Sequence, residues 1–145
     1  MKEEILGRVE VEDKWGNLLN VVFTSNRIIV ARLATILPHL ILPALFGGPG
    51  DWRKERRERR EEYGRLSAES ILKADEKNFE ISYTEIVKVE MKKPGTFRGA
   101  KIKIFTSNKT YEFTSKEKKD LFDERINLVR SVLPDKLSIT QEVRP

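Results

Sequence analysis

The sequence predicts a mainly β domain with helices, in which a C-terminal helix packs on an antiparallel sheet. Apolar and polar residues alternate over residues 101–105 and 110–114, on either side of a polar turn, and this pattern is typical of a β-hairpin. After the hairpin, apolar side chains recur at the spacing of one helix face until Pro134. An apolar helix face needs an apolar partner, and the earlier strands supply a sheet for it.

The predicted closing helix has a marked start and one apolar face. Thr114-Ser-Lys-Glu117 fits a capping box, in which the side chains of Thr114 and Glu117 each bond the other residue's backbone N–H. The apolar face consists of Leu121, Phe122, Ile126, Val129, Val132 and Leu133. We expect this face to close the core of the sheet.

The first part of the chain contains three strand patterns. Residues 5–12 alternate apolar and charged side chains, which predicts a half-buried strand followed by a turn over residues 13–17. Residues 18–24 and 27–32 are nearly continuously apolar. That composition predicts two central strands, buried on both faces.

One short phrase occurs twice between strand patterns. Phe-Thr-Ser-Asn stands at residues 23–26 and again at residues 105–108. Asn tolerates a positive φ, and a Ser or Thr hydroxyl can bond the backbone of a turn. We therefore predict one hairpin chemistry used twice, rather than an internal duplication.

Residues 33–50 carry no formal charge. Their apolar part is roughly 16 residues, about 24 Å as a helix, which is too short for a hydrocarbon core of about 30 Å. Three interpretations remain open. The segment is a kinked helix packed on the barrel or on a second subunit, an interfacial or re-entrant membrane contact, or a lid over a small apolar ligand.

Residues 51–63 have a strongly helical and highly charged composition. At about 100° per residue, one side of this helix carries acids and the opposite side carries arginines. The acids are Asp51, Glu55, Glu58 and Glu62, and the arginines are Arg53, Arg56, Arg57 and Arg60. One interpretation is a solvated helix with internal ion pairs, such as Lys54 with Glu58. The other is an arginine stripe that binds lipid headgroups or the acidic face of a second copy.

The remaining segments give weaker patterns. Residues 66–72 predict a short turn or helix after Ser67, and residues 75–78 a polar linker. Residues 79–93 alternate with one break, which predicts a bent strand or two short strands. Residues 134–145 are expected to form a tail that is mobile or pairs with a neighbour.

The composition excludes several kinds of functional site and partner. The 145 residues include 28 basic and 23 acidic side chains, a net charge of +5, a single His and no Cys. Disulfides, thiolate nucleophiles and Cys-bearing zinc sites are therefore excluded. High content of both charges is common in heat-adapted proteins.

No segment is a basic tail, so we do not expect nucleic-acid binding. The N-terminus lacks the apolar run of a secretory signal, which predicts a cytoplasmic protein.

The order of these signals resembles bacterial and archaeal pleckstrin-homology-like (PH-like) domains, including GRAM-type relatives. The residues that carry the resemblance lie at 23–30, 79–90, 100–105 and 111–113. It implies one domain over residues 1–145, a bent antiparallel barrel capped by the C-terminal helix, with a helical insertion at residues 33–77.

Members of this family are known to bind phosphoinositides, to bind peptides or to form homo-oligomers. Eukaryotic relatives that bind phosphoinositides carry several Lys and Arg around the first hairpin, whereas the turn at residues 13–17 has one Lys beside an Asp. Other members bind peptides between the helix and an exposed strand, and many microbial members form homo-oligomers.

The predicted function is a non-enzymatic binding or assembly module without cofactor or metal. The sequence has no Gly-rich phosphate loop after a strand and no Ser or Cys nucleophile near a His. We expect self-association or docking of a protein through the apolar insertion and the arginine stripe. Peripheral association with an anionic membrane, at its inner face, is the alternative. The predicted contact residues are Leu37, Leu40, Ile41, Leu45, Phe46, Trp52, Arg53, Arg56, Arg57 and Arg60.

Overall fold

The structure is a computed structural model that describes residues 3–35, 52–94, 99–115 and 117–140. The strands are β1 (Ile5–Glu12), β2 (Asn17–Thr24), β3 (Arg27–Thr35), β4 (Phe79–Ser82), β5 (Ile86–Lys92), β6 (Ala100–Thr106), β7 (Thr110–Ser115) and β8 (Leu137–Thr140). The helices are α2 (Trp52–Arg65), α3 (Ala68–Lys73), the 3₁₀ turn η1 (Tyr83–Glu85) and α4 (Lys119–Val132). The prediction of a mainly β fold with helices is confirmed.

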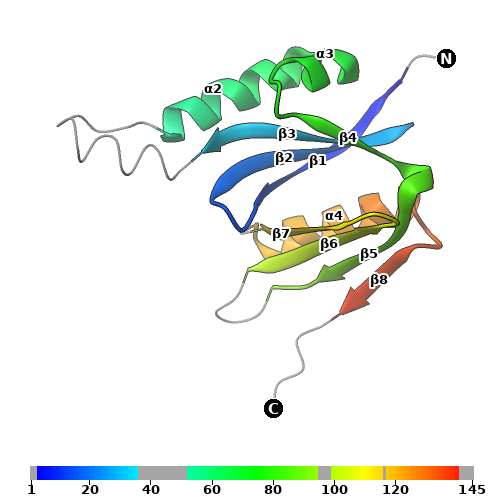
Figure 1. Ribbon diagram of the computed structural model, residues 1–145. Coiled ribbons are helices and arrows are strands. Elements are labelled where there is room, and N and C mark those ends of the chain that lie inside the picture. Colours follow the sequence, from blue (N-terminus) through cyan, green and yellow to red (C-terminus); the bar gives the residue numbers. More distant parts are fainter. Residues whose placement is uncertain (1–2, 36–51, 95–98, 116, 141–145) are drawn as a thin grey trace.

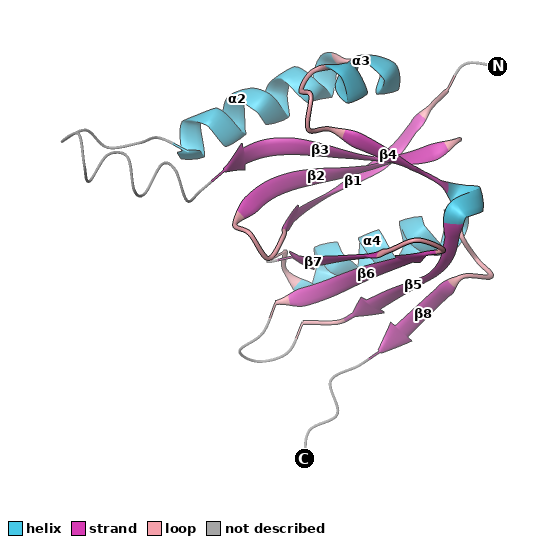
Figure 2. Cartoon of the chain, viewed as in Figure 1, coloured by secondary structure: helices cyan, strands magenta, loops and turns pink. Residues whose placement is uncertain are grey.

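The strands form one sheet in the order β4-β3-β2-β1-β7-β6-β5-β8. It bends into two halves that face each other, and the chain crosses between them through η1 (Figure 2). We call β4-β3-β2-β1 the first half-sheet and β7-β6-β5-β8 the second half-sheet. Along the middle of the sheet, β1 and β7 pair at Glu12 and Thr114. Because β1 and β7 pair over so short a length, the sheet can bend between them.

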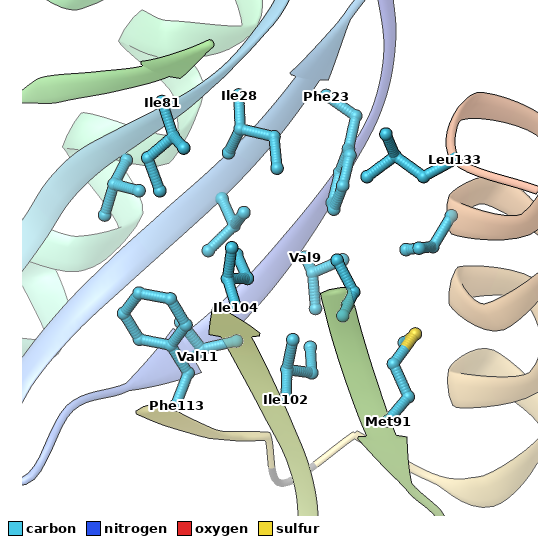
Figure 3. Close-up of a cluster of buried hydrophobic side chains, with 14 of the residues drawn as sticks. Val9, Val11, Phe23, Ile28, Ile81, Met91, Ile102, Ile104, Phe113 and Leu133 are labelled. Carbon is cyan, nitrogen blue, oxygen red and sulfur yellow. The ribbon is translucent and has the colours of Figure 1, made fainter. Parts of the chain in front are cut away.

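The main core lies between the two half-sheets. Val9, Phe23 and Ile28 enter it from the first half-sheet, and Met91 and Ile102 from the second (Figure 3). Helix α4 closes one side of this core with Phe122, Ile126 and Val129. The helix lies so near β1 that a Cβ on Gly7 would come within 2.4 Å of a Leu128 methyl carbon.

A second apolar cluster lies on the outer face of the first half-sheet, under α2 and α3 (Figure 1). Its buried residues are Val22, Ile29, Ala31, Leu33, Tyr63, Ala68 and Ile71. Strands β2 and β3 are therefore covered on both faces. This confirms the prediction of two central strands and explains why they lack alternation.

The repeated hairpin phrase uses the same chemistry at both sites, through its Thr. The Thr24 hydroxyl accepts a hydrogen bond from the Arg27 backbone N–H at 2.9 Å. The Thr106 hydroxyl accepts the equivalent bond from Lys109 at 3.1 Å. Among the described residues no side-chain-bearing residue has a positive φ, so these turns do not use the left-handed conformation that Asn tolerates.

The predicted capping box is wrong. Thr114 belongs to β7, where it pairs with Lys101, and α4 begins only after Lys118, whose side chain makes no capping bond. Pairing along β7 holds Thr114 in an extended strand, which displaces the helix start. One residue of the predicted apolar face is also misplaced, since Leu121 is 37% exposed.

Of the two alternatives for the last part of the chain, mobility or pairing with a neighbour, the structure shows pairing. Residues 137–140 form β8, which runs parallel to β5 with Leu137 opposite Val89. The expectation of a purely antiparallel sheet is therefore wrong at this one pairing. Residues 79–93 form two strands, β4 and β5, and the short helix α3 starts at Ser67, whose hydroxyl accepts the Ser70 N–H, as predicted.

Candidate functional site

The predicted contact residues fall into three groups. Leu37, Leu40, Ile41, Leu45 and Phe46 lie outside the described residues. Trp52 and Arg53 belong to the first turn of α2, and their side chains also lie outside the description. Arg56, Arg57 and Arg60 can be placed. In the described part of the chain, no helix is long and apolar enough to cross a membrane.

Two of the three placed arginines face the protein itself. Arg60 forms an ion pair with Glu10 of β1, with 2.9 Å between Nη2 and Oε2. Arg56 is half-buried and lines a cleft of about 240 Å³ together with Glu10 and Glu12. Arg57 is exposed. The stripe is therefore divided, and much of its charge is met by acids of the same chain.

One more acid of this cleft, Glu117, lies between β7 and α4. Burial raises the pKa of Glu117, while Arg125, with Nε 3.4 Å from Oε2, opposes that rise. Arg56 lines the cleft together with three acids, Glu10, Glu12 and Glu117. With Arg60 paired to Glu10 and Arg125 to Glu117, these charges indicate ion pairing within the chain rather than a site for an external anion.

Sequence reasoning missed the residues that hold α2 on the sheet. Tyr63 is fully buried, and its hydroxyl donates to the Arg32 carbonyl oxygen at 2.7 Å. Asp75 receives Arg59 at 2.8 Å and Arg32 at 3.1 Å. Burial would raise the pKa of Asp75, but these arginines and the Lys77 backbone N–H hold it below its ordinary value. Residues 75–78, expected to be a polar linker, therefore help to hold α2 on the sheet through Asp75.

A second cleft, of about 500 Å³, opens between the β1–β2 turn, the start of β4 and the start of β7. We call it the aromatic groove. It is lined by Asp13, Lys14, Trp15, Leu19, Phe79, Lys109, Thr110, Tyr111, Glu112 and Phe113. Phe113 lies on the side of the core away from α4 (Figure 3). The groove is thus the side of the bent sheet that the C-terminal helix does not close.

The β1–β2 turn holds Trp15 outward at the groove. One Asp13 carboxylate oxygen accepts hydrogen bonds from the backbone N–H groups of Trp15 and Asn17, each at 2.9 Å. Gly16 follows with a φ of 81°, a conformation that a side chain would strain. Trp15 is 69% exposed, and the Lys14 ammonium lies 5.2 Å from its ring centroid. A fixed turn therefore presents a large apolar surface to solvent.

Two stacked rings form the floor of the groove. Phe79 and Tyr111 lie with ring centroids 5.4 Å apart, and the Lys109 ammonium lies 4.7 Å from the Tyr111 centroid. Burial and the nearby Glu85 carboxylate raise the pKa of the Tyr111 hydroxyl above its ordinary value. These rings come from β4 and β7, which are adjacent only because the sheet bends.

Beside the rings runs an incompletely paired strand edge. Strand β7 pairs with β6 from Thr110 to Ser115, whereas within the described residues its pairing with β1 is at Thr114. Backbone N–H and C=O groups of an extended strand point alternately to its two edges. The part of β7 that lines the groove can therefore accept hydrogen bonds from an added strand.

The groove's formal charges cancel, because Asp13 and Glu112 balance Lys14 and Lys109. Within the described ranges, no group of His, Asp or Glu side chains could hold a metal ion. The geometry therefore favours contact with apolar side chains and a peptide backbone over capture of a polyanion.

Comparison with known proteins gives a likeness of fold. No family model and no curated protein matches the chain. Among solved structures, the chain is similar to the hSac2 domain from the human phosphoinositide phosphatase Sac2, with a TM-score of 0.54 and 9% identity. The match covers 98% of this chain and 79% of that domain. At this identity the likeness concerns the fold and agrees with a mainly β architecture.

Proposed function

We propose that this chain is a non-enzymatic binding module of PH-like fold that docks an extended segment of another protein in the aromatic groove. The observation that carries the proposal is the juxtaposition of exposed Trp15, the Phe79–Tyr111 stack and the open edge of β7. Strand addition of this kind takes its affinity from backbone hydrogen bonds and its specificity from pockets for alternate side chains.

The assignment of a PH-like fold rests on three features together. These are the sequence signals named above, a sheet bent into two facing halves and a C-terminal helix on one side of the core. The residues between β3 and β4, including α2 and α3, are then an insertion. The similar solved domain belongs to a phosphoinositide phosphatase. We do not extend phosphoinositide binding to this groove, because its lining charges cancel.

The earlier expectation of docking through the arginine stripe stays a prediction. Arg60 binds Glu10, and Arg56 shares a cleft with acids of its own chain. Arg57 and Arg60 are both exposed to solvent, and of these Arg60 is paired with Glu10. The aromatic groove therefore offers the stronger candidate surface for a protein partner.

The test uses the full chain and a displayed library of random peptides. Peptides selected on the parent protein are measured by fluorescence polarisation against Trp15→Ala and against Leu6→Ala, a control that shortens an exposed apolar side chain outside the groove. A central aromatic contact contributes 2 kcal/mol or more, so we expect Trp15→Ala to weaken binding by about 30-fold or more and the control to change it little. Equal affinity of both variants for the peptide would refute docking in the aromatic groove.

Backbone docking has its own readout. A bound peptide is N-methylated either at its odd-numbered or at its even-numbered residues, and each form loses the N–H donors that face one side of the strand. The form that loses the donors facing β7 should bind at least about tenfold more weakly than the other. If both methylated forms bind as well as the unmethylated peptide, strand addition to β7 is wrong even where Trp15 matters.

A further inference from the structure

The outer face of β5 and β6 carries a concentration of lysines. Lys88 and Lys92 of β5 and Lys101 and Lys103 of β6 alternate with core residues, so all four point away from the core. We call this set the lysine face. Between its side chains lies a shallow hollow of about 210 Å³, lined by Glu90, Met91, Lys92, Lys101 and Lys103.

The charges of the lysine face are incompletely neutralised. Lys88 forms an ion pair with Glu90 at 2.7 Å. Lys92 stands directly opposite Lys101 in the β5–β6 register, and like charges in such a position destabilise a sheet. Lys103 has Glu90 opposite it on β5 and Glu112 opposite it on β7. Four lysines and two glutamates thus leave a net positive face at a cost in stability, which is the arrangement expected where an external anion supplies the missing charge.

Apolar groups border the same face. Val87, at the start of β5, is 62% exposed. Phe105 of β6 is partly exposed, and the Lys88 ammonium lies 5.3 Å from its ring centroid. A membrane surface matches this combination, since anionic headgroups attract lysines while exposed apolar side chains enter the interface.

We propose that the lysine face binds the surface of an anionic membrane. The charged side chains of the face include no arginine, the residue whose planar donor fork suits specific recognition of single phosphates and nucleic acids. A lysine is a compact charge on a flexible stem, which suits a diffuse layer of headgroups. The four lysines do not line the aromatic groove, so either proposal can fail without the other, although Glu112 borders both surfaces.

The first experiment measures sedimentation of the full chain with vesicles of phosphatidylserine and phosphatidylcholine, and with vesicles of phosphatidylcholine alone. Binding is expected with the mixed vesicles, decreasing as salt screens the surface charge. Lys92→Gln/Lys101→Gln should weaken it about 25-fold, taking about a fivefold contribution from each lysine. The control Lys73→Gln/Lys119→Gln removes two exposed lysines from helices and should bind as the parent does.

A single substitution separates lost binding from lost folding. Lys92→Glu replaces a like-charge pair with an opposite-charge pair across β5 and β6. We expect its melting temperature to rise by about 1–3 °C while vesicle binding decreases. Trp15→Ala, in the aromatic groove, should leave vesicle binding unchanged.

Three results would overturn the assignment. These are equal binding of Lys92→Gln/Lys101→Gln and its control, equal pelleting with phosphatidylcholine vesicles alone, and tighter lysine-dependent binding to duplex DNA or polyglutamate than to the mixed vesicles. The last result would assign the lysine face to a soluble polyanion instead of a membrane.

Discussion

The outer face of the first half-sheet is covered by α2 and α3, whereas the outer face of β5 and β6 carries solvated lysines. The covered face buries Val22, Ile29 and Leu33. The other presents Lys101 and Lys103 at the corresponding outward positions. Both half-sheets share one core, so the difference lies outside it. The covered face holds α2 and α3, whereas the face of β5 and β6 is open to solvent.

The largest expected effect breaks the core that both half-sheets share. Ile126→Asp combined with Val129→Asp would bury two carboxylates on the face of α4 that closes this core. We expect no cooperative thermal transition. Leu121→Asp, on the same helix but 37% exposed, is the control and should still melt cooperatively. A double variant that melts as hot as the parent would contradict the role of α4.

The next effect concerns the attachment of α2 and α3 to the first half-sheet. Asp75→Asn removes the charge that Arg32 and Arg59 contact and should lower the free energy of unfolding by about 1.5–3 kcal/mol at neutral pH. Faster amide hydrogen exchange in α2 should accompany it. Glu76→Gln, an exposed neighbour with the same charge change, is the control.

The same variant gives a pH test. Because the folded pKa of Asp75 is lowered, its contribution to stability is complete above the ordinary Asp pKa of about 3.9 and is lost as the pH falls through the folded value. The difference in unfolding free energy between parent and Asp75→Asn should therefore be constant above about pH 5 and shrink in acid. A difference that grows in acid would contradict the ion-pair assignment.

The smallest effect compares one substitution on the two outer faces. Val22→Thr adds a hydroxyl under α2 and α3, where the side chain is fully buried, and should cost about 1–3 kcal/mol. Val87→Thr adds the same hydroxyl at a position 62% exposed and should change stability by less than about 0.5 kcal/mol. Urea denaturation of both variants measures the contrast. Equal costs would show that the two faces are equally covered.

Local patterns predicted most elements because each depends on nearby residues. Alternation located β1, β6 and β7, and helical spacing located α4. The capping box failed because sheet pairing holds Thr114 in β7. The sequence predicted the helix α2 with acids and arginines on opposite sides. It did not predict the contact of Arg60 with Glu10, because that acid lies 50 residues earlier in the chain.

The sequence by itself determined the strand and helix segments, the turn chemistry and the two-sided burial of β2 and β3, since hydrophobic period and side-chain hydrogen bonding act over a few residues. Only the tertiary structure decided where the sheet bends, that β8 runs parallel to β5, and that Trp15, Phe79 and Tyr111 share a groove. These depend on contacts between distant segments, whose energies no local pattern records.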